Sequence, residues 1–223
     1  MKKIFVLVLV IAILLVSVTA FVDKEESSSS ESSQHVCPDE FADYKPVIYL
    51  YPEKETDVEV VLDYAGELTC VYPEYNGKWE VTAFPDGTLI GKNGMEYNYL
   101  YWEGVGGFEP HFSEGFCVAG EDTAEFLESA LAKLGLNRRE ANEFIVYWLP
   151  QMEVNEYNLI SFQFENYEEA ARLTVIPAPD TSIRVFMSWK PLSEKVDIES
   201  QTLTSPERNG FTLVEWGGSK IED

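Results

Sequence analysis

Three glutamates and one histidine gather in a segment that is otherwise rich in glycine and aromatic residues. The segment 102–115 reads WEGVGGFEPHFSEG and contains Glu103, Glu109, His111 and Glu114. Glycoside hydrolysis uses two carboxylates, one as the acid and one as the nucleophile or base, so a pair of these glutamates could serve that chemistry. Glutamate is abundant throughout the chain, and any loop of this length would collect several. Since loops on a rigid scaffold often carry sites, 102–115 is the best single candidate for function.

His111 is the only histidine available for a site, because His35 lies in a polar N-terminal region. It could pair with Cys117 as the base of a cysteine nucleophile, but nothing between the two residues resembles a turn that activates a thiol. The HExxH and CxxC spacings of zinc sites and the DxDxDG loop of calcium sites do not occur in the sequence. We therefore predict no metal site and no cofactor.

Alternate residues of the segment 95–102 (MEYNYLYW) are tyrosines. In a strand, Tyr97, Tyr99 and Tyr101 would share one face, with Leu100 and Trp102 on the other. Tyrosine has an apolar ring and a polar tip, which suits stacking on sugar rings or docking of a partner. The candidate ligand-binding residues are Tyr97, Tyr99, Tyr101 and Trp102. One face must belong to the core, however, and we expect it to be the tyrosine face, with Tyr99 buried and Leu100 and Trp102 less buried.

The chain has three cysteines, Cys37, Cys70 and Cys117. In an oxidising compartment two of them could form a disulfide, which would leave one thiol over. Cys70 and Cys117 both fall within predicted strands, which can hold two side chains at a fixed separation, so we predict a bridge between them. Cys37 would then be free or paired between chains. A reducing environment would leave all three as small apolar side chains.

The N-terminus has the layout of an export signal. Lys2 and Lys3 precede an apolar run over 4–16, and Val18 and Ala20 are small residues at the spacing of a cleavage site. Cleavage between Ala20 and Phe21 would release a soluble protein, whereas without cleavage 1–20 would remain as an N-terminal membrane anchor. We expect the rest of the chain to be secreted or anchored to the outer face of the cytoplasmic membrane.

The segment 21–35 includes the run DKEESSSSESS and is predicted to be a disordered acidic tether. The residues 36–223 have the length of a single globular domain. The formal net charge of −23 repels nucleic-acid phosphates and anionic membrane surfaces. We therefore expect no nucleic-acid partner, membrane contact only through an uncleaved N-terminal segment, and an extracellular ligand or protein as the partner.

Short apolar runs separated by turn residues indicate strands on both sides of a helical region. The strands are predicted at 46–51, 58–62, 68–72, 79–84, 95–102, 159–164, 173–176, 183–189 and 211–216. Between them, Asp122 with Glu125 and Asn137 with Glu140 have the spacing of helix capping pairs. Gly135 would end the first helix, and Pro150 would stop the second. The pattern predicts an α+β fold: an antiparallel sandwich-like or barrel-like sheet with an inserted αα-hairpin.

Several segments in a fixed order resemble a family of uncharacterised microbial proteins. They are KPVIYLYPE (45–53), PDGTL (85–89), YNYLYWEG (97–104), EFIVYWLP (143–150), NLISF (158–162), IRVFMSWKPL (183–192) and VEWGG (214–218). The resemblance spans 45–218 and implies one domain with a shared fold. It implies no activity, cofactor or catalytic residue.

These observations favour a secreted or cell-surface module that acts by binding, without catalysis, through aromatic and acidic surfaces. The alternative is an extracellular hydrolase directed at glycans, with carboxylates of the 102–115 loop as its catalytic groups. The two hypotheses differ in one arrangement: an enzyme should place at least two of the three loop glutamates around one cleft.

Overall fold

A computed structural model describes residues 42–221, which lie within one compact unit of the chain. The predicted signal or anchor (1–20), its cleavage site at Ala20 and Phe21, the tether (21–35) and Cys37 lie outside these residues. Within 42–221, no helix combines the length and the apolar character needed to cross a bilayer.

The described residues form two β-sheets, and both follow from the short apolar segments of the sequence. The larger sheet has seven strands in the order β3-β7-β1-β12-β11-β9-β8. Their bounds are β1 Ala42–Tyr51, β3 Glu67–Tyr72, β7 Leu100–Val105, β8 Phe116–Ala119, β9 Tyr157–Gln163, β11 Thr181–Leu192 and β12 Thr212–Lys220. The smaller sheet is antiparallel, in the order β10-β2-β4-β5-β6. Its strands are β2 Thr56–Tyr64, β4 Trp79–Ala83, β5 Leu89–Gly91, β6 Glu96–Tyr97 and β10 Ala171–Ile176.

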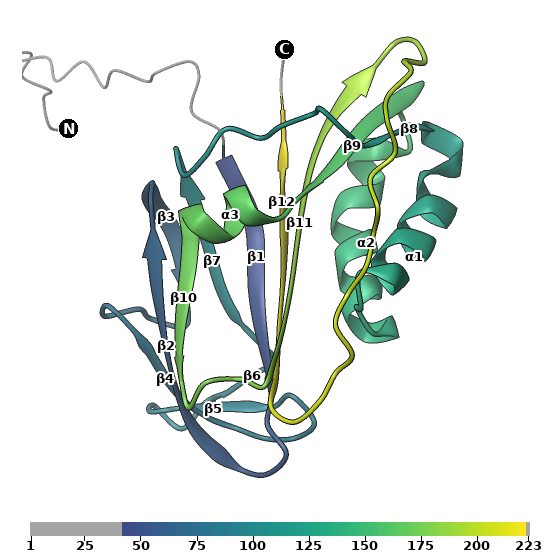
Figure 1. The fold of residues 1–223 in the computed structure, drawn as a ribbon. Coiled ribbons are helices and arrows are strands. Elements are labelled where there is room, and N and C mark those ends of the chain that lie inside the picture. Colours follow the sequence, from purple (N-terminus) through teal and green to yellow (C-terminus); the bar gives the residue numbers. More distant parts are fainter. Residues whose placement is uncertain (1–41, 222–223) are drawn as a thin grey trace, which may run out of the picture. The chain divides into compact units, whose positions relative to one another are not determined.

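The helices α1 (Thr123–Lys133) and α2 (Arg138–Met152) cover one face of the larger sheet, and the smaller sheet lies against the other face (Figure 1). Alternation along the strands builds a core on each side. Val47 and Tyr49 of β1 pack toward the helices, whereas Ile48 and Leu50 pack toward the smaller sheet. A short 3-10 turn (Gly120–Asp122) precedes α1, and α3 (Glu165–Ala170) connects β9 to β10. The predicted α+β fold with a sandwich-like pair of sheets and an αα-hairpin is confirmed, and the barrel-like alternative is not.

The larger sheet is mixed rather than antiparallel as predicted, because β12 runs parallel to β11. The two strands are joined by the long segment 193–211, which passes beside the helix pair before entering β12 (Figure 1). Side chains fix this crossover near its middle and near its C-terminal end. Gln201 exchanges two hydrogen bonds with the backbone of Phe162, and Arg208 pairs with Glu140 of α2.

The predicted disulfide is not formed, and both Cys70 and Cys117 carry free thiols. Cys70 lies on β3 and Cys117 on β8, the two outer strands of the larger sheet, with five strands between them. Neighbouring strands are about 4.8 Å apart, whereas a disulfide needs α-carbons within about 7 Å. The prediction is therefore wrong, because both cysteines are in strands but at opposite edges of the same sheet.

Candidate functional site

The predicted strand 95–102 is divided between the two sheets, and this division creates a groove. Residue Tyr97 ends β6 in the smaller sheet, and Leu100 begins β7 in the larger one, so the chain crosses between the sheets at Asn98 and Tyr99. The crossing opens a groove of about 510 Å³, which we call the tyrosine groove. Its aromatic lining consists of Tyr72, Tyr97, Tyr99, Tyr101 and Tyr147, and its polar lining of Lys45, Glu96, Asn98 and Glu103.

The expected orientation of this segment is reversed. Leu100 and Trp102 are each 0% exposed and belong to the core between the sheets. The Trp102 indole N–H donates a hydrogen bond to Oε1 of the buried Glu215 at 3.1 Å, so Trp102 cannot serve as a ligand-binding residue. Tyr97, Tyr99 and Tyr101 are only partly buried and line the groove together. The alternation was predicted correctly, but the face assigned to the core was wrong.

Contacts between rings hold the tyrosines in place. The rings of Tyr72 and Tyr97 meet edge to face with centroids 5.4 Å apart, and Tyr99 meets the buried Tyr49 in the same way, also at 5.4 Å. Such pairs stabilise a fixed ring geometry beyond the area they bury. The aromatic lining of the groove is therefore preformed.

Lys45 supplies the groove with a cation whose position is set by an unusual backbone conformation. Its φ is 54°, in the left-handed region, at a break in the register of β1. Its backbone N–H donates to Glu103 Oε1 at 3.2 Å. Its Nζ lies 5.5 Å from the ring centroids of Tyr99 and Tyr147 and 5.6 Å from that of Trp216. Three rings around one ammonium attract it through their π faces and hold it at the groove.

The hydroxyls of Tyr101 and Tyr147 remain hydrogen-bond donors over the ordinary pH range. Burial, and next the hydrogen bond and charge of Glu103, raise the pKa of Tyr101 far above its usual value. Burial and the same carboxylate also raise the pKa of Tyr147. Both hydroxyls therefore stay protonated, and the groove offers donors from tyrosine and lysine and acceptors from glutamate and asparagine.

The three loop carboxylates do not share the tyrosine groove. Glu103 is half-buried on β7 and lines the tyrosine groove, whereas Glu109 and Glu114 are exposed and do not line it. His111 is also exposed, and it is held through its backbone, whose N–H and C=O both bond the Gln163 side chain. Among residues 42–221, no three His, Cys, Asp or Glu side chains are grouped so that they could hold a metal ion.

A second cluster of ionisable groups is buried between the two sheets. Arg184 of β11 pairs with Glu215 of β12 at 2.6 Å, and both side chains are almost fully buried. Asp43, 1% exposed, accepts a hydrogen bond from the Tyr64 hydroxyl at 2.7 Å. Burial raises the pKa of Asp43 to about 7, the hydrogen bond from Tyr64 opposes this change, and the charge of Glu215 adds to it. This cluster bears on stability rather than on ligand binding.

Five residues of the groove were not identified as site residues from the sequence. Glu96 and Asn98 are neighbours of the predicted tyrosines, and the other three are Lys45, Tyr72 and Tyr147, which belong to other elements. These three come from β1, β3 and α2, which are far apart in the chain. Only Tyr72 carried a local signal, as an aromatic residue at the end of a predicted strand. The positive φ of Lys45 is a property of the folded sheet, and the position of Tyr147 depends on how α2 crosses that sheet.

The fold and the groove define this protein as an α+β domain of two packed sheets with an open, tyrosine-lined groove beside its helix pair. The chain is 49% identical over 65 residues to a protein of Butyrivibrio fibrisolvens named "Uncharacterized protein in bglA 3'region". The match covers 28% of this chain and 67% of that protein, so the chain belongs to the same family as this uncharacterised bacterial protein. No family model matches the chain, and no solved structure matches it.

Proposed function

We propose that this protein is a non-catalytic binding module that works outside the cytoplasm and holds a glycan in the tyrosine groove. The export-like N-terminus supports the location. The observation that carries the proposal is the groove itself, which is lined by five tyrosines from separate elements. The Lys45 ammonium lies over the rings of two of them, Tyr99 and Tyr147.

The chemistry of the groove suits a polyhydroxylated ring. One side of a sugar ring is a surface of C–H groups, which packs well on the faces of aromatic rings, and its rim carries hydroxyls that both donate and accept hydrogen bonds. The rings of Tyr72, Tyr97 and Tyr101 provide the faces. Lys45, Asn98 and Glu103 provide groups for the rim. A volume of about 510 Å³ falls within the range of small-molecule sites.

The charges around the groove favour a neutral sugar over a charged one. One cation, Lys45, stands against the two carboxylates Glu96 and Glu103. The formal charge of the whole chain, −23, repels acidic ligands at longer range. A cationic ligand would compete with Lys45, whose ammonium already occupies the faces of Tyr99 and Tyr147. A neutral glycan meets neither obstacle.

Binding of the purified full chain to a panel of neutral and acidic oligosaccharides tests the proposal. We expect retention of neutral members and a loss of at least about tenfold in affinity for Tyr72→Ala, since Tyr72 is 59% exposed on the groove. Phe164→Ala is the matched control, because Phe164 is an exposed aromatic residue that does not line the groove. Absence of binding to every oligosaccharide, or equal binding by Tyr72→Ala, would overturn the proposal.

A further inference from the structure

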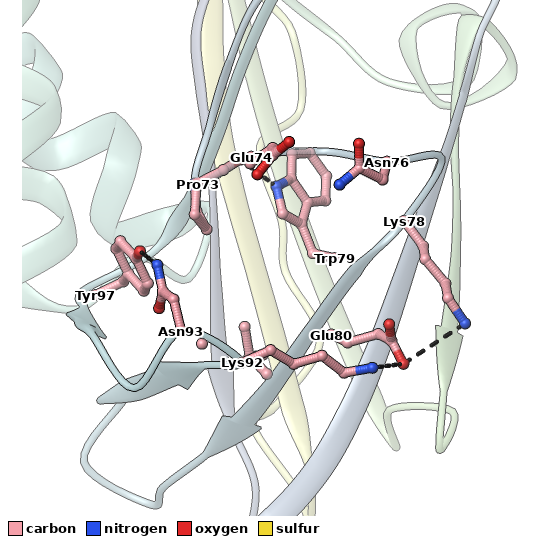
Figure 2. Close-up of a pocket in the computed structure, with 11 residues that line it drawn as sticks. Pro73, Glu74, Asn76, Lys78, Trp79, Glu80, Lys92, Asn93 and Tyr97 are labelled. Atoms are coloured by element: carbon pink, nitrogen blue, oxygen red, sulfur yellow. Dashed lines mark hydrogen bonds and ion pairs between the residues drawn. The ribbon is translucent and has the colours of Figure 1, made fainter.

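We infer that the pocket on the other side of Tyr97 is a second subsite for the same ligand, and that the ligand is an extended neutral oligosaccharide crossing the Tyr97 ring. This inference rests on the proposed function and extends it. Two hollows of the surface share Tyr97 as a wall: the tyrosine groove and a smaller one of about 270 Å³, which we call the polar pocket. Figure 2 shows the polar pocket, with Tyr97 and Asn93 at one end and Lys78 at the other.

Tyr97 is fixed in a position that can serve both hollows. Its hydroxyl accepts a hydrogen bond from Asn93 Nδ2 at 2.7 Å (Figure 2), and its ring packs against Tyr72. On β5, Gly91 leaves the space that the ring needs, since a Cβ at this position would lie 2.9 Å from Cε2 of Tyr97. The ring therefore stands between the two hollows as a fixed aromatic surface over which a ligand chain can pass.

The polar pocket carries hydrogen-bonding groups whose charges are largely balanced. Lys92 Nζ lies 2.6 Å from Glu80 Oε1, and Lys78 Nζ lies 3.7 Å from the same oxygen (Figure 2). Asn76 is exposed and lines the pocket, as does the buried Trp79, whose indole N–H donates to the backbone carbonyl of Pro73. Amides and paired charges bind hydroxyl groups without favouring an ion. A neutral polyhydroxylated chain therefore fits the polar pocket as well as the tyrosine groove.

If both hollows bind the same ligand, the affinity of the protein for an oligosaccharide should depend on the length of that oligosaccharide. A short sugar is held by the tyrosine groove alone, whereas a longer chain reaches past Tyr97 and also contacts the polar pocket. An additional contact region raises affinity because the second group binds within an already formed complex. The probe is the series of β-1,4-linked glucose oligomers from the disaccharide to the hexasaccharide, because these are neutral, extended and flat.

Calorimetric titration of the full chain with this series tests the inference. We expect the affinity to rise at least about fivefold from the disaccharide to the hexasaccharide. The double variant Asn76→Ala/Lys92→Ala should abolish this rise and leave disaccharide affinity unchanged, because both residues lie in the polar pocket and not in the tyrosine groove. Tyr72→Ala is the complementary variant and should weaken every member of the series.

Each contrary result has a distinct meaning. Affinity that does not change with length, or a double variant that keeps the rise, would overturn the second subsite and leave the proposed function standing. If the protein binds other neutral glycans but no glucose oligomer of this series, the second subsite for such a ligand is overturned and the proposed function stands. Failure of the wild-type chain to bind any glycan would overturn both. The unfolding temperature of the double variant should stay close to that of the wild type, since Asn76 and Lys92 are exposed and a surface ion pair such as that of Lys92 with Glu80 contributes little.

Discussion

Asp43 is a carboxyl group enclosed between the two sheets, beside the ion pair of Arg184 and Glu215. Its raised pKa, about 7, means that burial keeps it protonated at a pH where an exposed aspartate is ionised. An ordinary aspartate has a pKa near 3.8. Between these two values the folded state binds a proton that the unfolded state has lost, so the contribution of Asp43 to stability falls as pH rises through this range.

The replacement Asp43→Asn removes this titration and keeps a side chain that can bond the Tyr64 hydroxyl. We expect the unfolding free energy of the wild type, relative to the variant, to fall by up to about 1.4 kcal/mol per pH unit between pH of about 5 and 7. Urea unfolding of the wild type and the variant over this pH range measures the difference in unfolding free energy. Asp86→Asn is the control, because Asp86 is exposed and its pKa is lowered, chiefly by a hydrogen bond from the Thr88 backbone. A difference between wild type and Asp43→Asn that is constant with pH would contradict the expected burial.

The two faces of the segment around Tyr99 should respond differently to truncation. Leu100→Ala removes a side chain that is 0% exposed, and we expect it to lower the unfolding free energy by about 2–5 kcal/mol. Tyr97→Ala, on the groove-side face of the same segment, should cost less, since that side chain is only partly buried. Chemical denaturation of both variants measures the difference. Equal losses would contradict the orientation that the structure gives this segment.

The sequence predicts that side chains alternate between two environments, but it does not say which environment is the interior. In 99–102, Tyr99 and Tyr101 alternate with Leu100 and Trp102, and all four are aromatic or apolar, so composition does not separate the two faces. The smaller sheet determines which face lies in the interior, because it covers the side that carries Leu100 and Trp102. The tyrosines lie on the side that the helix pair covers only in part, and this could not be read from the residues themselves.

At the scale of elements, the two helix starts test how far local sequence determines structure. The predicted capping box of α2 is confirmed: the Asn137 side chain accepts from the N–H groups of Arg139 and Glu140, and Glu140 bonds the Asn137 N–H in return. The equivalent pair at α1 is not formed, because the Asp122 side chain makes no capping bond. A 3-10 turn precedes α1 and places Asp122 in helical conformation rather than the extended conformation of a usual N-cap, and its carboxylate accepts no hydrogen bond from the first turn of α1.

Asn137→Ala and Asp122→Ala should therefore differ in their effect on stability. We expect Asn137→Ala to lower the unfolding free energy by about 1 kcal/mol, which is typical of a lost N-cap. Asp122→Ala should change it by less than about 0.5 kcal/mol, since this residue is exposed and makes no cap bond. Thermal or urea unfolding of the two variants makes the comparison. A loss as large for Asp122→Ala would show that its carboxylate caps α1 in solution.

Strands and helices were largely predictable because their signals are local, whereas their pairing was not. The turn at Gly135, with φ +87°, and the helix pair follow the predicted pattern. Helix α2 continues past Pro150 to Met152, because a proline near the end of a helix breaks only one of its last hydrogen bonds. The parallel pairing of β11 and β12 depends on the crossover 193–211, whose course is fixed by distant contacts such as Arg208 with Glu140.

For the whole molecule, the width of the larger sheet decides what the cysteines can do. Both Cys70 and Cys117 were correctly assigned to strands, yet they lie on opposite outer strands. The order of strands in a sheet is set by the connections and by burial across the entire domain. The tyrosine groove has the same origin, since β1, β3, α2 and the crossing between the sheets all contribute to it.

The large negative charge is a further property of the whole molecule and predicts a response to salt. A formal charge of −23 repels itself more strongly in the compact state, and salt screens this repulsion as the Debye length falls from about 30 Å at 0.01 M to about 8 Å at 0.15 M. We therefore expect the unfolding temperature at neutral pH to rise by a few degrees, on the order of 1 kcal/mol in stability, over this range of sodium chloride.

Local attraction opposes this effect. Surface ion pairs such as Lys78 with Glu59, Lys92 with Glu80 and Arg138 with Glu128 are weakened by salt, but each contributes at most about 1 kcal/mol. Repulsion involves all the unpaired carboxylates and should dominate. Repeating the experiment near pH of about 5, where more carboxylates are protonated, should give a smaller rise. If salt lowers the unfolding temperature at neutral pH, the ion pairs outweigh the net charge, and the excess acidic residues do not limit stability.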